Sequence, residues 1–137
     1  MKRILCSVDG SEHADIALIA AMEFAAKFEA KLSVLTVNVA FGRSPRSPQA
    51  LVWTKQEAQA MLDAAAALVS KSGQKVSGAT VVVAREASGG IIDYAIEHDI
   101  DAIVLGTGDK RGLSRLFLGS VAADVAHRAP CTVIIAR

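Results

Sequence analysis

The sequence contains few of the residues that build disulfide bonds or metal sites. It has two cysteines, Cys6 and Cys131, and neither belongs to a redox motif or to a metal-ligand spacing. Two free thiols suit a reducing compartment. The scarcity of cysteine therefore predicts a cytoplasmic protein that folds without disulfides and without a resident metal.

Long apolar runs and an excess of either charge are absent as well. No apolar run approaches the ~18 residues that span a bilayer, and Asp9 interrupts the first run before it reaches the length of a signal peptide. Fifteen Lys and Arg against 14 Asp and Glu leave a formal net charge of +1, so no global field attracts nucleic acid or an acidic membrane. We expect no nucleic-acid partner and no membrane insertion.

Groups suited to catalysis are scarce and scattered. The three histidines are His13, His98 and His127, and the last two fall near the C-terminal ends of predicted helices, where a positive charge is favourable. His13 falls in the first turn of a predicted helix, close enough to the expected crevice to touch a ligand. No second acid stands beside Asp9 at the end of its strand. The sequence therefore predicts a binding protein rather than an enzyme.

What the chain does contain is a regular alternation of short apolar runs with helical periodicity, in a composition that is 52% hydrophobic. The runs predict five strands, at residues 4–8, 32–39, 79–84, 102–105 and 132–136. Helical patterns fill the connections, with Asp9-Gly10-Ser11 and Ser88 as expected start signals and Ser72-Gly73 as a stop. This alternation implies one α/β domain with an open five-stranded parallel sheet and helices on both faces.

The most informative segment leads from Leu105 to Val121, out of the fourth strand and into the last helix. It is rich in glycine, and Gly119-Ser120 opens the helical pattern. Backbone N–H groups at a helix N-terminus lack intrahelical partners, and the helix dipole favours an anion there. Residue types alone leave two interpretations open, a phosphate-binding turn and a flexible surface loop.

A crevice is expected where strands end. In parallel α/β sheets ligands bind at the carboxyl ends of the strands, where strand order reverses. Asp9 ends the first strand and Gly106 the fourth, so neighbouring positions for these strands would bring both residues to one crevice. Asp9 is either a ligand contact or a turn acid ahead of its helix. Ser120 is either a phosphate donor or a helix cap, and Val37 by itself is a core valine.

The chain resembles the universal stress protein family over essentially its whole length, as a single domain of residues 1–137. The motifs that carry the resemblance are Ile4-Leu5-Cys6-Ser7-Val8-Asp9-Gly10-Ser11-Glu12, Leu35-Thr36-Val37, Asp101-Ala102-Ile103-Val104-Leu105-Gly106, residues 112–121 and residues 129–135. The resemblance implies the strand order 3-2-1-4-5, a fold of the adenine nucleotide alpha hydrolase type. Members are small cytoplasmic proteins and usually dimers.

The resemblance also implies a nucleotide site. One branch of the family binds ATP through the pattern Gly, two residues, Gly, nine residues, Gly, then Ser or Thr. Matched residue by residue, the family's ligand contacts fall here on Ser7, Val8, Asp9, Val37, Leu105, Gly106, Asp109, Gly119, Ser120 and Val121. Gly108 joins them because it lies one residue before the second glycine of the pattern, and a register shift of the loop could bring it there. ATP is the expected ligand, with AMP or ADP as alternatives.

The pattern has one mismatch, because Asp109 stands where the second glycine belongs. A carboxylate facing a triphosphate repels it by about 1 kcal/mol at 4 Å in a water-like medium. Asp109 could instead point outward, pair with Lys110 or Arg111, or hold Mg²⁺ beside the phosphates. Two hypotheses follow: an ATP-binding regulatory module with at most slow hydrolysis, and a dimeric stress-response interaction protein that has lost ATP binding through Asp109.

The last predicted strand, residues 132–136, is apolar and is expected at a sheet edge. An exposed apolar edge is an aggregation hazard unless something covers it. The family resemblance indicates that the strand pairs with its two-fold mate, which agrees with the preference of oligomers for closed symmetry. We expect a homodimer with a regulatory protein partner that the sequence does not identify.

Overall fold

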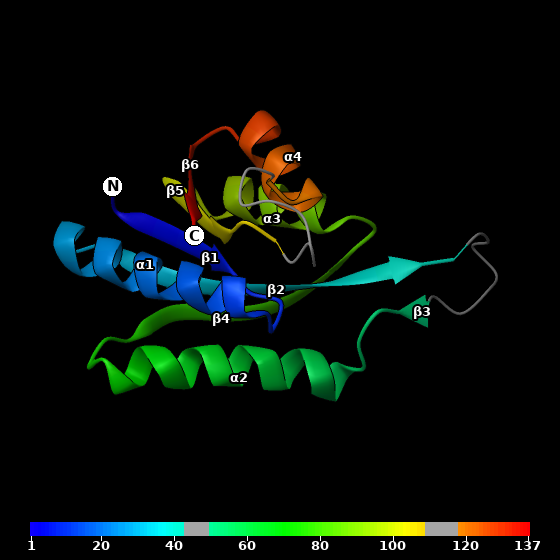
Figure 1. Ribbon diagram of the computed structural model, residues 1–137, viewed down its shortest axis with the longest axis horizontal. Coiled ribbons are helices and arrows are strands. Elements are labelled where there is room, and N and C mark those ends of the chain that lie inside the picture. Colours follow the sequence, from blue (N-terminus) through cyan, green and yellow to red (C-terminus); the bar gives the residue numbers. More distant parts are fainter. Residues whose placement is uncertain (43–49, 109–117) are drawn as a thin grey trace.

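The computed structural model describes residues 1–42, 50–108 and 118–137. It has three layers, with helices on both faces of a central sheet (Figure 1). The strands are β1 (Arg3–Ser7), β2 (Lys31–Phe41), β3 (Ala50–Leu51), β4 (Val76–Ala84), β5 (Ala102–Gly106) and β6 (Thr132–Ala136). The helices are α1 (Glu12–Phe28), α2 (Lys55–Lys71), α3 (Ala87–Glu97) and α4 (Ser120–Arg128).

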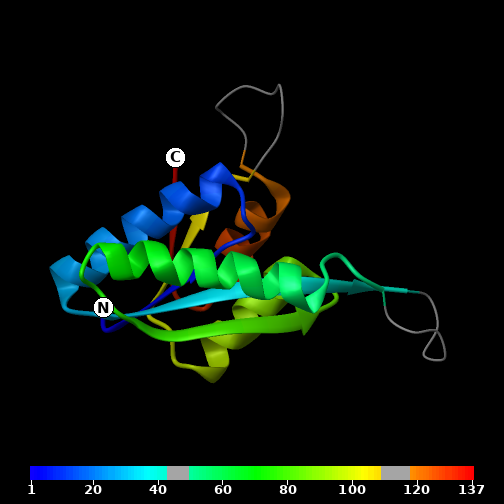
Figure 2. The ribbon, with the colours of Figure 1, turned by 90° about the horizontal axis from the view of Figure 1, so that it is seen from below.

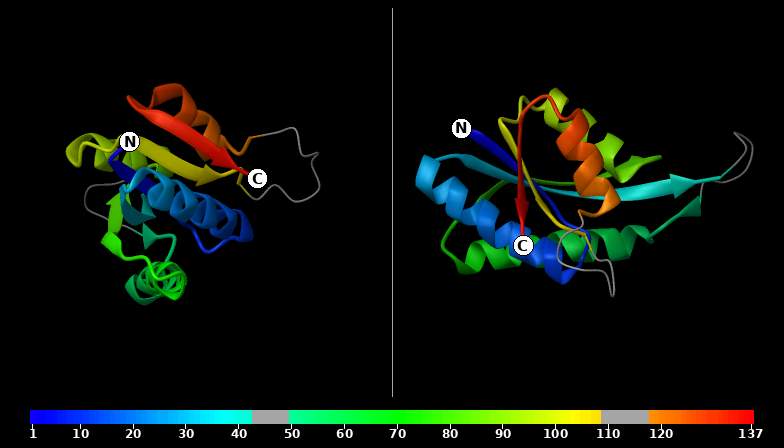
Figure 3. Two further views of the ribbon diagram at one scale, coloured as in Figure 1. Left: turned by 90° about the vertical axis from the view of Figure 1, so that its left-hand side faces the viewer. Right: turned by 45° about the horizontal axis from the view of Figure 1, so that its top comes forward.

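The five long strands run parallel in the order β4-β2-β1-β5-β6. This is the order 3-2-1-4-5 that the family resemblance implies, and it places β1 beside β5 as the expected crevice requires. Figure 3 (left) shows β6, in red, at one edge of the sheet beside β5. The sixth strand, β3, was not predicted. It pairs antiparallel with the end of β2 through Ala40 and Phe41, and two residues are too short to produce a periodic pattern.

Each face of the sheet has its own hydrophobic core. Helices α1 and α2 cover one face (Figure 2), and α3 and α4 cover the other (Figure 3, right). Side chains alternate along each strand, so in β1 Ile4 and Cys6 enter the first core and Leu5 enters the second. Both faces are buried, which explains why these strands are continuous apolar runs rather than alternating ones.

Two cap signals of the sequence differ from the structure. Ser120 is the first residue of α4 and not its cap, because Gly119 is the N-cap. The hydroxyl of Ser11 accepts the Ala14 amide and begins α1, as predicted. The prediction that Ser88 caps α3 is wrong, because Glu86 is the N-cap and Ser88 lies buried inside the first turn. Its hydroxyl donates to Asp124 of α4, and this bond, followed by that of Arg128, lowers the pKa of the Asp124 carboxyl. Ser88 therefore links two helices instead of starting one.

The two cysteines are free thiols. Burial raises the pKa of the Cys6 thiol to about 12, so it stays protonated and unreactive near neutral pH. Cys6 lies in β1 and Cys131 directly precedes β6, and strand β5 lies between these two strands. Among the helices of the described residues, none has both the length and the apolar character of a membrane span.

One exposed carboxylate fastens the N-terminus to the sheet. Asp101 Oδ2 accepts the backbone amides of Lys2 at 2.6 Å and Arg3 at 2.8 Å. These two bonds lower the pKa of the Asp101 carboxyl. A carboxyl with a lowered folded pKa stabilises the protein above its unfolded pKa of about 3.9, and the contribution is lost as pH falls through the folded pKa.

We expect Asp101→Asn to lower the urea midpoint at pH 7, because it removes the charge that strengthens both bonds. The difference from wild type should shrink steadily below about pH 4, where the wild-type carboxyl itself becomes protonated. Urea unfolding at pH 7, 4 and 3 checks this. Asp93→Asn, on the exposed face of α3, is the control. A pH-independent difference between the Asp101 variant and wild type would contradict the argument.

Adjacent glycines in α3 should respond oppositely to alanine. A Cβ on Gly89 meets nothing nearer than 3.9 Å, whereas one on Gly90 lies 2.9 Å from Val37 Cγ1 and 3.0 Å from Ala84 Cβ. Gly89→Ala should stabilise the protein by up to about 1 kcal/mol, since Ala is the better helix former. Gly90→Ala should destabilise it by about 1–3 kcal/mol through overpacking. Denaturant unfolding measures both, and equal effects would refute this account of the packing.

Candidate functional site

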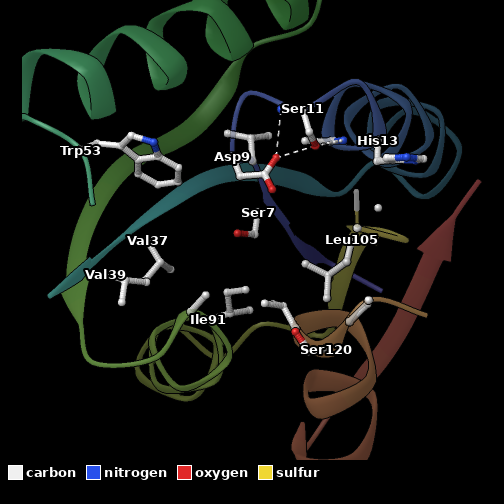
Figure 4. Close-up of a pocket in the computed structure, with 18 residues that line it drawn as sticks. Ser7, Asp9, Ser11, His13, Val37, Val39, Trp53, Ile91, Leu105 and Ser120 are labelled. Carbon is white, nitrogen blue, oxygen red and sulfur yellow. Dashed lines mark hydrogen bonds between the residues drawn. The ribbon is translucent and has the colours of Figure 1, made fainter. Parts of the chain in front are cut away.

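A cavity of about 350 Å³ opens at the carboxyl ends of β1, β2 and β5. This lies within the usual range of about 300–1,000 Å³ for small-molecule sites. Figure 4 shows its residues. They are Ser7, Val8, Asp9, Ser11, His13, Ala14, Val37, Val39, Trp53, Ala87, Ile91, Leu105, Gly106, Gly108, Gly119, Ser120, Val121 and Ala122.

Gly106 at the end of β5 packs directly against the first turn of α1. A Cβ at this position would lie 2.6 Å from the carbonyl carbon of His13 and collide with its oxygen. The next residue, Thr107, contacts the same turn, with its Oγ1 3.2 Å from His13 Nδ1. Gly106 is therefore needed for helix–strand packing, whatever ligand the cavity holds.

The start of α4 is held against β5 in a similar way. The Gly119 amide donates to the Thr107 carbonyl at 2.6 Å, and a Cβ on Gly119 would lie 2.7 Å from that oxygen. Gly108 has a φ of +86°, which favours glycine. Among the described residues no side chain caps helix α4, so within that part of the chain its first amides, from Ser120 onward, are available to an anion.

Asp9 forms a turn with Ser11 at the end of β1. Its Oδ1 accepts the Ser11 amide at 3.0 Å and the Ser11 hydroxyl at 2.6 Å, as the dashed lines in Figure 4 show. Asp9 is thus the turn acid that one interpretation predicted, and it also lines the cavity. The turn orients the carboxylate and leaves Oδ2 outside these two bonds.

Strand β2 continues past the end of β1, and there one of its backbone edges lies beside the cavity. The Val8 amide donates to Leu35 and the Val8 carbonyl accepts the Thr36 hydroxyl, so both backbone groups of Val8 are used within the protein. Backbone groups along a strand face alternate edges, and Leu35 faces β1. The backbone N–H and C=O of Val37 therefore face the same edge, past the end of β1 and beside the cavity.

The far side of the cavity is formed by Trp53, directly ahead of α2. The amide side chain of Asn38, which is 2% exposed, donates to the Trp53 carbonyl at 2.8 Å and accepts the Trp53 amide at 3.0 Å. In Figure 4, Trp53, Val37 and Val39 lie on one side of the cavity, and Leu105, Ser120 and His13 on the other. The cavity therefore has an apolar end and a polar end.

Ten of the eleven residues assigned from the sequence line this cavity together. The eleventh, Asp109, lies outside the described residues, and the roles of all eleven as ligand contacts stay predictions. Sequence reasoning did not assign Ser11, Ala14, Val39, Trp53, Ala87, Ile91 or Ala122 to the site. Trp53 could have been noticed as the only tryptophan in the chain. It lies outside every motif of the sequence, however, so nothing in the sequence placed it near the cavity.

The uncapped amides at the start of α4 suit an anion, and the side of the cavity lined by Trp53, Val37 and Val39 suits a flat, hydrophobic group. Among the described lining residues Asp9 carries the only carboxylate, and the described residues contain no group of three His, Cys, Asp or Glu side chains that could hold a metal. The arrangement favours binding of an amphipathic anion. A nucleotide has this combination of a base and a phosphate.

A model of the universal stress protein family matches residues 1–137. This chain belongs to that family. Family membership agrees with the resemblance of the sequence motifs and with the parallel sheet and four helices that the structure contains.

Relatives span nearly the same length. The universal stress protein YxiE of Bacillus subtilis is 28% identical over 147 aligned positions, which cover 98% of each chain. A universal stress protein solved in complex with cAMP is 28% identical, with a TM-score of 0.75 over 99% of this chain and 97% of the other. The universal stress protein of Archaeoglobus fulgidus in complex with dAMP is 26% identical, with a TM-score of 0.74 over 100% of this chain and 98% of the other.

Proposed function

We propose that this protein is a regulatory module that binds an adenine nucleotide in the cavity between β1, β2, β5 and α4. The main support is that ten residues taken from the family's ATP-binding branch converge on one cavity of suitable size. Two relatives above 25% identity were solved with cAMP and with dAMP. The protein acts by binding rather than by catalysis, and its free thiols suit the cytoplasm.

The two ends of the cavity assign an orientation to the nucleotide. In the proposal the phosphate meets the free amides at the start of α4, near Ser120, where the helix dipole also favours it. The ribose lies near the Asp9 carboxylate, whose Oδ2 can accept a sugar hydroxyl. The base reaches the edge of β2, where the Val37 backbone can pair with its polar edge.

The length of the phosphate chain is a separate part of the proposal. ATP is the ligand that the family pattern implies, whereas the two relatives hold nucleotides with a single phosphate. In the ATP hypothesis Asp109 either repels the triphosphate or holds a Mg²⁺ ion beside it. This residue lies outside the described part of the chain. The described lining residues supply one carboxylate, and its Oδ1 already accepts two bonds from Ser11. We therefore base the tests on AMP, with ATP and Mg²⁺ measured in parallel.

Ser120→Asp should weaken AMP binding by about tenfold or more without loss of stability. A carboxylate at the first position of α4 repels the phosphate by about 1 kcal/mol at 4 Å in water and by more in a partly dry site. The same charge stabilises a helix N-terminus by about 0.3–1 kcal/mol. Isothermal calorimetry with AMP and a thermal melt separate the two effects.

Ala123→Asp is the matched control, since it adds the same charge one turn further along α4 at an exposed position outside the cavity. It should bind AMP nearly as wild type does. Equal AMP affinity in wild type and Ser120→Asp would contradict the proposed position of the phosphate at the start of α4. Absence of AMP and ATP binding in the wild type would refute the nucleotide hypothesis and favour the dimeric interaction protein.

We also propose a homodimer that pairs through β6. Within the described part of the chain β6 pairs with β5 alone, and its residues Val133 to Ala136 are all partly exposed. The Thr132 amide donates to Asp101, so by alternation the amides of Val133 and Ile135 face outward. These amides are available to the same strand of a second copy, which would cover an apolar edge.

Val133→Pro should convert the dimer into a monomer while the fold survives. Proline removes an outward amide, and edge strands tolerate it where that amide faces away from the sheet. Val133→Ala, which shortens the side chain but keeps the amide, is the control. Analytical ultracentrifugation at micromolar concentration checks the prediction, and a wild-type protein that sediments as a monomer would contradict it.

A further inference from the structure

The apolar end of the cavity has an aromatic wall that none of the family motifs includes. Trp53 is the only tryptophan, and its side chain is half-buried where it lines the cavity with Val37, Val39 and Ile91. Figure 4 shows the indole on the side of the cavity away from Ser120. The ring thus lies at the end opposite the proposed phosphate position.

Trp53 is fixed by its backbone rather than by its side chain. The buried amide of Asn38 binds both the N–H and the C=O of Trp53. On one flank, the Val52 amide donates to Val39 at 3.0 Å. On the other, Thr54 begins α2 with a capping box. The indole is therefore attached to a rigid segment and does not need a ligand to bring it to the cavity.

The indole has no aromatic partner within the described residues. The ring contacts of that part of the chain are Phe24 with Phe28 and Tyr94 with His98. A large apolar ring usually packs against other groups, and a partly exposed ring on a cavity wall offers a face to a ligand. The edge of β2 at Val37 lies beside the same part of the cavity. One planar group can therefore contact the indole with its face and the Val37 backbone with its edge.

We propose that Trp53 is a specificity-determining residue of this site, on which the base of the nucleotide stacks, and that Asn38 is the residue that positions it. The inference rests on the proposed nucleotide function and adds the basis of selection. The site takes phosphorylated ligands that carry a planar aromatic ring and rejects sugar phosphates that lack one. Stacking on tryptophan is strong and tolerates different bases, because every base has a π-face.

A pair of substitutions separates aromatic stacking from simple hydrophobic contact. Trp53→Leu keeps an apolar side chain without a ring, and Trp53→Phe keeps a ring. Loss of base stacking reduces affinity by about 5- to 150-fold, so Trp53→Leu should bind AMP weakly in calorimetry. Trp53→Phe should stay within about threefold of wild type, since it retains a π-face. Val52→Ala, at an exposed neighbouring position outside the cavity, should bind AMP as wild type does.

Fluorescence of the wild-type protein gives a second readout, because all indole emission comes from Trp53. Saturation with AMP should quench this emission, and ribose 5-phosphate at the same concentration should not. Thermal melts of the Trp53 variants check that each remains folded at the temperature of the binding experiments, because the side chain is partly buried. Equal losses in Trp53→Phe and Trp53→Leu would mean that the residue only shapes the cavity, and the inference would be overturned.

The failure of this inference is distinguishable from failure of the proposed function. If wild type binds AMP and Trp53→Leu binds it equally well, the nucleotide site stands and the role of Trp53 is overturned. The same conclusion follows if AMP binds to wild type without changing its indole emission. Wild type that binds no AMP overturns the proposed function, and the stacking role falls with it. AMP binding that weakens in Trp53→Leu but survives in Trp53→Phe supports both.

Discussion

The site depends on a backbone contact between the end of β5 and the first turn of α1. A side chain at Gly106 would collide with the carbonyl of His13, so only glycine lets the strand end approach the helix. A second close backbone contact joins the start of α4 to the residue after β5, where the Gly119 amide donates to the Thr107 carbonyl. These two contacts bring the start of α4 and the end of β1 to the same crevice. A glycine pattern that suggests a phosphate loop is therefore also a packing requirement.

In the proposed function the chemistry of the site is that of binding. The polar groups at the cavity are the amides at the start of α4, the backbone edge of Val37 and the carboxylate of Asp9, which its turn with Ser11 orients. Burial raises the pKa of the Cys6 thiol to about 12, and this thiol lies in a hydrophobic core away from the cavity. Fixed dipoles with one apolar wall select a ligand by shape and charge, which agrees with the proposed nucleotide site.

The parts of the structure that were predictable are those encoded by neighbours in sequence. Apolar runs located the five parallel strands, and Ser11 was recognised as a cap because its hydroxyl bonds an amide three residues away. Ser88 was misassigned because its hydroxyl donates to Asp124 of α4, a partner far along the chain. Strand β3 escaped because two residues carry no period, and its pairing depends on the end of β2.

By itself the sequence determined the fold class, because burial of both sheet faces makes the inner strands continuous apolar runs. The resemblance of its motifs supplied the family and ten of the residues that line the cavity. Tertiary structure alone decided how the cavity is closed at its apolar end. Trp53 reaches the cavity through the amide of Asn38, fifteen residues away in sequence. These two bonds satisfy the buried Asn38 side chain with backbone groups of a residue far along the chain. No local sequence pattern encodes such a pairing.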